Sequence, residues 1–215
     1  MFDKIINSGI LGDYEYLFKK FEKPRKVYRR DTEKSNRISA EVAKFNKDFL
    51  ETFFTSWTKS VFLRYAFLIS NNEQEKITKF EQIHMCNNVY KADKNDLALY
   101  HIFKFVNVNF IDLVDFLHSP SNDVLTLKVS VTCMGIIGEH KGESPLEEQR
   151  SFNYDIEFVK ANDESIKERS ANYSSNCPNC GAPTHINTFG VCEHCQEIVS
   201  IYDNIWKIKK IALDD

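Results

Sequence analysis

The chain has 215 residues, of which 42% are hydrophobic and 27% charged, and its formal net charge is −3. This length and composition suit one ordinary globular domain with a short appendage and exclude a predominantly disordered chain. No stretch approaches the roughly 18–20 apolar residues that a membrane span needs, and the N-terminus lacks the layout of a signal peptide. We therefore expect a cytoplasmic protein. Peripheral attachment to the inner face of the membrane is the alternative that this expectation leaves open.

Residues 1–37 are predicted to form an amphipathic and basic N-terminal segment. Residues 19–37 contain nine Lys or Arg against three acidic residues, a net of 9 − 3 = +6, which leaves −3 − 6 = −9 for the rest of the chain. A basic arm on an acidic body predicts an anionic partner, and a solvated, partly disordered lead-in is the alternative. The candidate residues for binding lipid or another anionic partner are Lys19, Lys20, Lys23, Arg25, Lys26, Arg29 and Arg30.

Residues 38–165 carry the pattern of an α+β domain, which begins with helices. Ser39 is expected to cap a long Phe-rich helix, because apolar residues recur there with a period of about 3.6 residues. The apolar run 62–69 is expected to continue this helix or to pack just after it. A further helix is expected over 73–85 and a short one near 93–100.

The second half of this domain changes to the period of a strand. Apolar and polar residues alternate over 106–117, 125–133 and 152–158, which predicts half-buried antiparallel strands. A turn is expected at 119–122 and a charged loop over 138–150. Helices followed by long strands predict an α+β fold in which the helices pack on one face of a curved sheet.

Two cysteine pairs stand near the C-terminus, Cys177-Pro-Asn-Cys180 and Cys192-Glu-His-Cys195, with eleven residues between them. Two intervening residues let both thiolates of a pair turn onto one cation, and two pairs complete a tetrahedral shell without an open position for water. We therefore predict one structural Zn²⁺ in a ribbon over 174–211, with iron as the alternative metal. Two redox dithiols are the alternative interpretation. The predicted ligands are Cys177, Cys180, Cys192 and Cys195.

These features together resemble the Tim-44-like domain family, named for a subunit of the mitochondrial inner-membrane translocase, in its bacterial form with a C-terminal zinc ribbon. The resemblance covers residues 40–211 and rests on the Phe-rich helix, the cysteine pairs and the tail Tyr202-Asp203-Asn-Ile-Trp206. Related proteins have Trp directly after Asp in this tail, where this chain has Asn204. The resemblance implies a cystatin-like cone of the nuclear-transport-factor type, with a pocket between helices and a strongly bent sheet. It also implies a peripheral membrane protein linked to protein transport.

Three functions are open from the sequence. We favour a non-catalytic binding or scaffold protein, whose pocket takes an apolar or peptide ligand while the basic arm meets a protein partner or an anionic membrane surface. An enzyme of the cone fold acting on a small apolar molecule is the second, although no catalytic constellation is recognised. A nucleic-acid-binding zinc-ribbon protein is the third, disfavoured because residues 177–203 contain no Lys or Arg. The polar residues available to an enzyme are Tyr100, His101, Asp112, Asp115 and Tyr154.

Overall fold

The computed structural model describes residues 28–91, 97, 99–103, 105–137, 146–162, 177, 180, 182–183, 192–195 and 205–214. Five of the seven candidate anionic-contact residues lie outside this part of the chain, as does the predicted amphipathic stretch. None of the helices in the described part combines the length and apolarity that a membrane crossing needs. The five residues outside are Lys19, Lys20, Lys23, Arg25 and Lys26.

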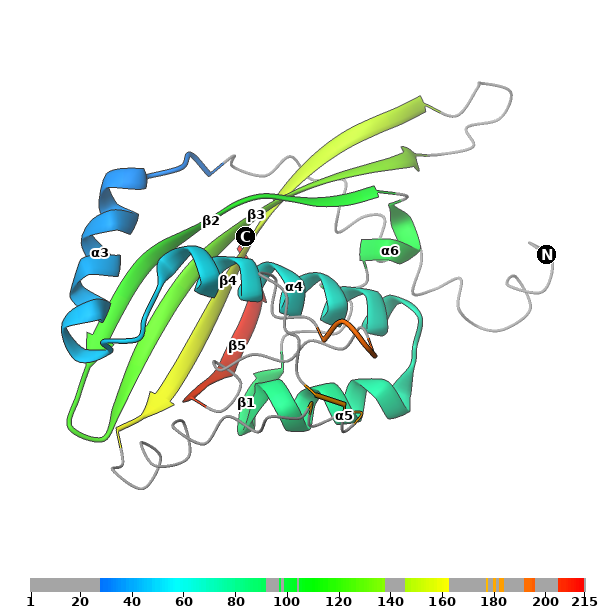
Figure 1. The fold of residues 1–215 in the computed structure, drawn as a ribbon. Coiled ribbons are helices and arrows are strands. Elements are labelled where there is room, and N and C mark those ends of the chain that lie inside the picture. Colours follow the sequence, from blue (N-terminus) through cyan, green and yellow to red (C-terminus); the bar gives the residue numbers. More distant parts are fainter. Residues whose placement is uncertain are drawn as a thin grey trace.

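A five-stranded mixed sheet forms the centre of the molecule, in the order β1-β5-β4-β3-β2 (Figure 1). Strands β2, β3 and β4 form an antiparallel meander, β5 pairs antiparallel with β4, and β1 pairs parallel with β5. With helices on one face, this arrangement confirms the predicted α+β class. The strands are β1 (Met85–Lys91), β2 (Phe105–His118), β3 (Asn122–Ile137), β4 (Leu146–Ala161) and β5 (Trp206–Leu213).

The long helix predicted from Ser39 is instead two helices, α3 (Thr32–Phe45) and α4 (Glu51–Ser70). Asp31 caps α3, because its side chain accepts a hydrogen bond from the Lys34 amide at 2.9 Å. After the break, Phe49 turns into the same core as α3 and α4, with 6% of its surface exposed. Hydrophobic periodicity therefore runs through the break without marking it.

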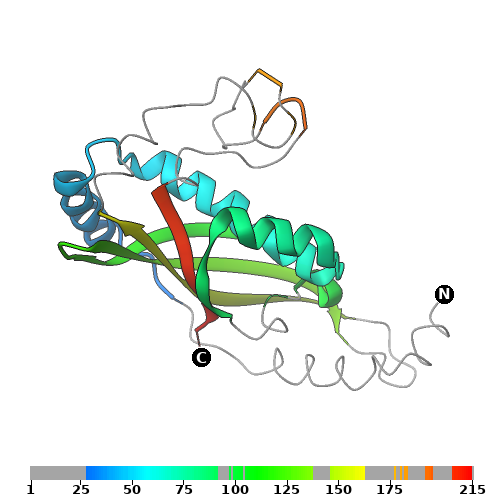
Figure 2. The ribbon, with the colours of Figure 1, turned by 90° about the horizontal axis from the view of Figure 1, so that it is seen from below.

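The remaining helices match the sequence more closely. Helix α5 (Gln74–His84) confirms the helix predicted over 73–85. The short α6 (Leu99–Ile102) lies at the end of the range where a short helix was expected. Figure 2 shows α4 and α5 on one side of the sheet, which we call the inner face, and we call the opposite side the outer face.

The inner face is filled by large apolar and aromatic side chains. Alternation along β3 puts Leu125, Leu127, Val129, Val131 and Cys133 into this core, each with 0% of its surface exposed, as predicted. Phe54 of α4 packs its ring 5.1 Å from that of Phe158 and 5.7 Å from that of Trp206. Phe62 lies 4.9 Å from Tyr154 between their ring centroids. Side chains thus occupy the space between α4 and the sheet.

Two segments that were expected outside the sheet belong to it. Residues 206–211, placed by the sequence in the ribbon, begin β5, whose Trp206, Ile208 and Ile211 are buried. Residues 146–150, expected in a loop, begin β4 and pair with β3 from Ile137 to Cys133. The backbone N–H and C=O groups of these charged residues pair with the long neighbouring strand β3. This pairing involves the backbone alone, so it does not require apolar side chains.

Candidate metal centre

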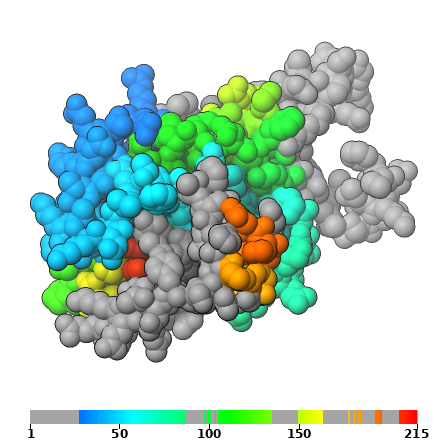
Figure 3. All heavy atoms as spheres, in the orientation of Figure 1, coloured from blue at the N-terminus to red at the C-terminus, as the bar shows by residue number. Residues whose placement is uncertain are grey.

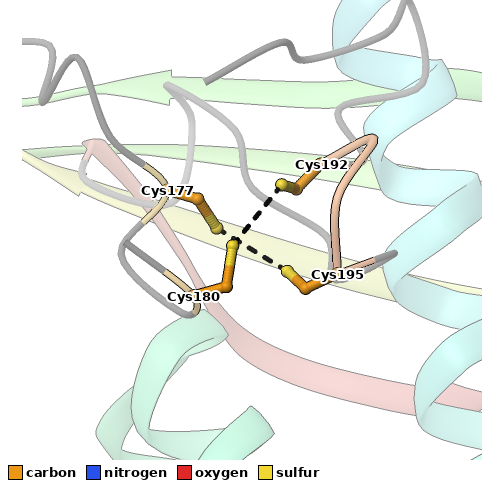
Figure 4. A group of neighbouring side chains, drawn as sticks. All are labelled: Cys177, Cys180, Cys192 and Cys195. Carbon is orange, nitrogen blue, oxygen red and sulfur yellow. Dashed lines mark hydrogen bonds between the residues drawn. The ribbon is translucent and has the colours of Figure 1, made fainter. Parts of the chain in front are cut away.

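The structure brings together the four cysteines that the sequence singled out (Figure 4). The Sγ atoms of Cys177 and Cys195 are 3.7 Å apart, and those of Cys180 and Cys192 are 4.0 Å apart. All four sulfur atoms lie within 4.8 Å of one another. Each pair of close sulfurs joins one cysteine from the first turn to one from the second, so the four form a single group.

These separations suit four ligands around one cation. In a tetrahedral shell with metal–sulfur bonds of about 2.3 Å, neighbouring sulfur atoms are roughly 3.8 Å apart. The separations of 3.7 and 4.0 Å between the sulfur atoms of these two pairs lie on either side of this value. A disulfide would need a separation of about 2.0 Å, and all four thiols are free. The group can therefore hold one metal ion without rearrangement.

Local backbone structure positions the first cysteine pair. The amide of Cys177 donates a hydrogen bond to the carbonyl of Ala182 at 2.7 Å, which closes a turn around Cys180. The amide of Ala182 in turn hydrogen-bonds the Cys180 sulfur. Peptide donors aimed at sulfur stabilise the thiolate, the form that binds a metal.

The neighbouring sulfurs change the protonation of Cys180. The Ala182 amide lowers the pKa of Cys180, but desolvation and the neighbouring sulfurs of Cys195, Cys177 and Cys192 together raise it to about 11. Four adjacent thiols cannot all ionise near neutral pH without a compensating positive charge. A divalent cation supplies that charge, and its binding releases the protons.

The cysteine turns lie on the helical side of the molecule. Figure 2 places them beyond α4 and away from the sheet, and Figure 3 shows them at the surface beside α5. Cys177 and Cys192 are buried with 1% and 0% of their surfaces exposed, whereas Cys180 is exposed. Four protein sulfurs leave no position for a substrate, so a metal held here has a structural role.

The polar residues considered for an enzyme do not converge. Tyr154 is buried in the inner-face core against Phe62, whereas Asp112 is held by the chain segment before α3. Asp115 is exposed on β2, and Tyr100 packs edge-on against Phe67 with 5.7 Å between ring centroids. The side chain of His101 lies outside the described residues. Those that are described supply no common site.

Of the seven candidate binding residues in the basic arm, the structure describes Arg29 and Arg30, which are both exposed and lie just before α3. Arg30 Nε lies 3.3 Å from Asp112 Oδ1, and no sequence pattern predicts this ion pair between the arm and β2. The amide of Asp31 donates to Asp112 Oδ2 at 2.9 Å. One of the two described candidate binding residues is therefore already bound to a carboxylate of the same chain.

A second polar group, which the sequence did not indicate, surrounds Asp123 at the end of the β2–β3 hairpin. Its carboxylate accepts hydrogen bonds from His118 Nδ1 at 2.6 Å, Asn162 at 2.8 Å and Asn46 at 3.1 Å. The Lys160 ammonium lies 3.7 Å away. Burial raises the pKa of Asp123, but these hydrogen bonds and Lys160 outweigh burial and lower it below its usual value. No spacing in the sequence connects these residues.

Comparison of the chain with protein-family models, with curated proteins and with solved structures finds no match. The Tim-44-like resemblance therefore depends only on the Phe-rich segment, the two cysteine pairs and the C-terminal tail named above, and no matched protein adds to it. The geometry of the cysteine group does not depend on that resemblance, because it follows from the positions of four sulfur atoms.

Proposed function

We propose that this protein is a non-catalytic binding or scaffold module with one structural Zn²⁺ bound by Cys177, Cys180, Cys192 and Cys195. The observation that carries the proposal is the group of four sulfurs within 4.8 Å of one another. Zinc is the metal proposed because it favours a tetrahedral thiolate shell and undergoes no redox change. Such a shell is saturated by the protein, so the ion orders the chain instead of activating water or substrate.

The proposal of a binding role draws on the sheet and the helices that cover it. A bent sheet with helices on its inner face is compatible with the cystatin-like cone that the Tim-44-like resemblance implies. Phe54 of α4 and Phe158 of β4 pack against each other and are fully buried, so they belong to the core, and the proposed apolar or peptide ligand does not depend on them. On this basis we propose a Tim-44-like scaffold linked to protein transport.

The second element of the proposal is attachment to an anionic membrane surface through the basic arm. The segment 19–37 carries a net charge of 9 − 3 = +6 on a chain whose total is −3. Each basic residue near an anionic bilayer contributes about 1 kcal/mol, so several together make a reversible anchor. The described part of the arm, residues 28–37, leads into and begins α3 and lies away from the cysteine turns (Figure 2).

Metal analysis tests the zinc assignment. The full chain, purified without added chelator, is expected to contain one zinc per molecule by elemental mass spectrometry. Cys177→Ser removes a buried ligand and is expected to abolish zinc retention. Cys86→Ser is the matched control, because Cys86 is a free cysteine of β1 outside the four-sulfur group. Iron at one per molecule, or no metal in the wild-type chain, would exclude the structural zinc.

Vesicle sedimentation tests the membrane role. Binding is expected to vesicles that contain phosphatidylserine, not to vesicles of phosphatidylcholine alone, and to weaken as salt is raised from 50 to 300 mM because salt screens the attraction. Neutralising residues 19–26 should abolish it. Salt-independent binding, or no binding to either vesicle, would contradict attachment through the basic arm. Retention of nucleic acid by the same residues would instead support the alternative of a nucleic-acid-binding protein.

A further inference from the structure

The chain enters α3 through a short strap, residues 28–31, that lies on the outer face of the sheet. The ring of Tyr28 is 6.0 Å from that of Phe110, and the Lys128 ammonium lies 5.7 Å from the Tyr28 ring centroid. The guanidinium of Arg30 is 6.0 Å from the Phe110 ring centroid. The strap therefore meets the sheet through ring contacts as well as through its ion pair.

Asp112 of β2 is the residue that holds the strap on the sheet. Its side chain is 1% exposed, and both of its oxygens are engaged, one by Arg30 Nε and the other by the Asp31 amide. The Leu113 amide donates to the Ser35 hydroxyl at 3.0 Å, which ties the first turn of α3 to the same point of β2. A buried carboxylate that lost these donors would have to return to water or take up a proton.

Among the described residues of the sheet, no Lys or Arg forms an ion pair with Asp112. Lys128 is its register partner on β3, and Asp155 is the partner of Lys128 on β4. The Lys128 ammonium lies 2.7 Å from Asp155 and 2.6 Å from Asp214, with which it forms its ion pairs. Lys128 is thus occupied by two other carboxylates, and Arg30 is the cation that balances Asp112.

Arg29 provides the contrast within the same strap. It is exposed, and the described residues give its guanidinium no ion pair. Arg30 also keeps 56% of its side-chain surface exposed, but its Nε is directed to Asp112. Of these two adjacent arginines, Arg30 is therefore bound by a carboxylate of the same chain, and Arg29 has no such carboxylate among the described residues.

We propose that Asp112 is an intramolecular clasp that withholds Arg30 from the anionic partner, so that of this arginine pair only Arg29 is presented to it. The clasp is an autoinhibitory contact, because release of Arg30 would add one cation to the partner-binding set and leave Asp112 uncompensated. Its effect on partner binding rests on the proposed function, whereas the clasp itself does not. Asp112 acts here by positioning Arg30 and does not itself contact the partner.

Amide hydrogen exchange at Asp31 tests the clasp independently of any partner, in the full zinc-loaded chain. Because the Asp31 amide is bonded to Asp112, Arg30→Gln is expected to speed its exchange about fivefold or more, while Arg29→Gln changes it less than about twofold. Asp112→Asn should have the larger effect, and Asp115→Asn, an exposed residue of the same strand, should have none. Equal exchange in Arg30→Gln and Arg29→Gln would overturn the clasp.

Vesicles that contain phosphatidylserine test the withholding of Arg30. At about 1 kcal/mol per basic residue near the surface, Arg29→Gln is expected to weaken binding about fivefold and Arg30→Gln less than about twofold. In the Asp112→Asn background, Arg30→Gln should also weaken binding about fivefold. Equal weakening by the two arginine substitutions in the wild-type background would overturn the autoinhibitory role. Absence of binding in every variant would remove the proposed anionic partner, and the exchange experiment would still decide the clasp.

Discussion

The cysteine group and the Asp123 group are both clusters of polar atoms, but they are built in opposite ways. The four cysteines come from residues 177–195, in two turns at the surface of the helical layer. The Asp123 group gathers Asn46, His118, Lys160 and Asn162 from the α3–α4 break, β2 and the end of β4. The first can hold a cation from outside the chain, whereas the second gathers its charged and polar partners within the protein.

This difference predicts different consequences of damage. A metal site closes a local segment, so its loss should disorder that segment and leave the sheet largely intact. A buried carboxylate that joins distant elements supports the whole domain, so its loss should lower the global free energy of unfolding. The predictions below test this contrast, beginning with the largest expected effect.

Removal of the metal should have the largest effect, confined to the cysteine turns. Binding of zinc to such sites is worth on the order of 10 kcal/mol, which is the free energy that orders the segment. Cys192→Ser is expected to abolish zinc binding and amide protection around residues 177–195. The α+β domain should lose only about 1–2 kcal/mol, because a longer open loop between the ends of β4 and β5 costs little free energy.

Urea unfolding monitored by tryptophan fluorescence measures the second part of this prediction. Trp57 and Trp206 are both buried in the inner-face core, so their emission reports the sheet and not the cysteine turns. Cys86→Ser is the control for loss of a thiol. If Cys192→Ser unfolded the sheet together with the turns, the metal site would be a global determinant and the contrast with Asp123 would fail.

Asp123→Ala should destabilise the whole domain by about 3 kcal/mol, because it removes a buried carboxylate and leaves its donors without an acceptor. His118, Asn46 and Asn162 each lose a hydrogen bond, and Lys160 loses its buried partner. The same urea titration measures the loss. Asp115→Ala, on an exposed residue of β2, is the control and should change stability by less than about 0.5 kcal/mol. Equal effects of the two substitutions would contradict the global role of Asp123.

The pH dependence of stability should carry the signature of Asp123. Because the pKa of Asp123 is lowered in the folded state, its contribution is fully present above the ordinary aspartate pKa of about 3.8–3.9. That contribution is lost as the pH falls below this value and through the lowered pKa of the folded state. Wild-type stability measured between pH 2 and 7 should fall more steeply in acid than that of Asp123→Asn. Parallel curves for the two proteins would show that Asp123 has the same pKa folded and unfolded.

The contrast between the two clusters also accounts for what the sequence could predict. The cysteine group was found from spacing, because all four ligands come from two short turns. The strands β2 and β3 and the core residues of β3, such as Leu127 and Val129, were found from alternation, since burial on one face has a period of two. Hydrophobic period alone could not locate the break before α4, because Phe49 keeps the apolar face continuous across it.

What the sequence left hidden depends on distant contacts. Asp123 and Asp112 are aspartates in strand segments, indistinguishable by pattern from the exposed Asp115. Only the fold brings Asn46 to Asp123, or Arg30 to Asp112, across more than seventy residues. The beginning of β5 was assigned to the ribbon, whereas the structure pairs β5 with β4, and Lys209 and Lys210 form ion pairs with Glu157 of β4.

His118→Phe should have the smallest effect on the free energy of unfolding. It separates the contribution of His118 from those of the other residues that bind Asp123. The ring of His118 stacks on Phe45 with 3.8 Å between centroids, and phenylalanine can keep this contact while losing the bond to Asp123. The side chain is 38% exposed, so water can partly replace the lost hydrogen bond, and the expected cost is about 1 kcal/mol. Asn162 and Asn46 still donate to Asp123, so the domain should remain folded.

A double-mutant cycle with Asp123→Asn then measures how strongly His118 and Asp123 act together. We expect the two substitutions to cost less in combination than the sum of their separate effects, by about 1 kcal/mol, because each removes the same hydrogen bond. Full additivity would mean that the 2.6 Å contact contributes nothing to stability. The buried carboxylate would then be held by Asn46, Asn162 and Lys160 alone, and the Asp123 group would join α3, β3 and β4 without the end of β2.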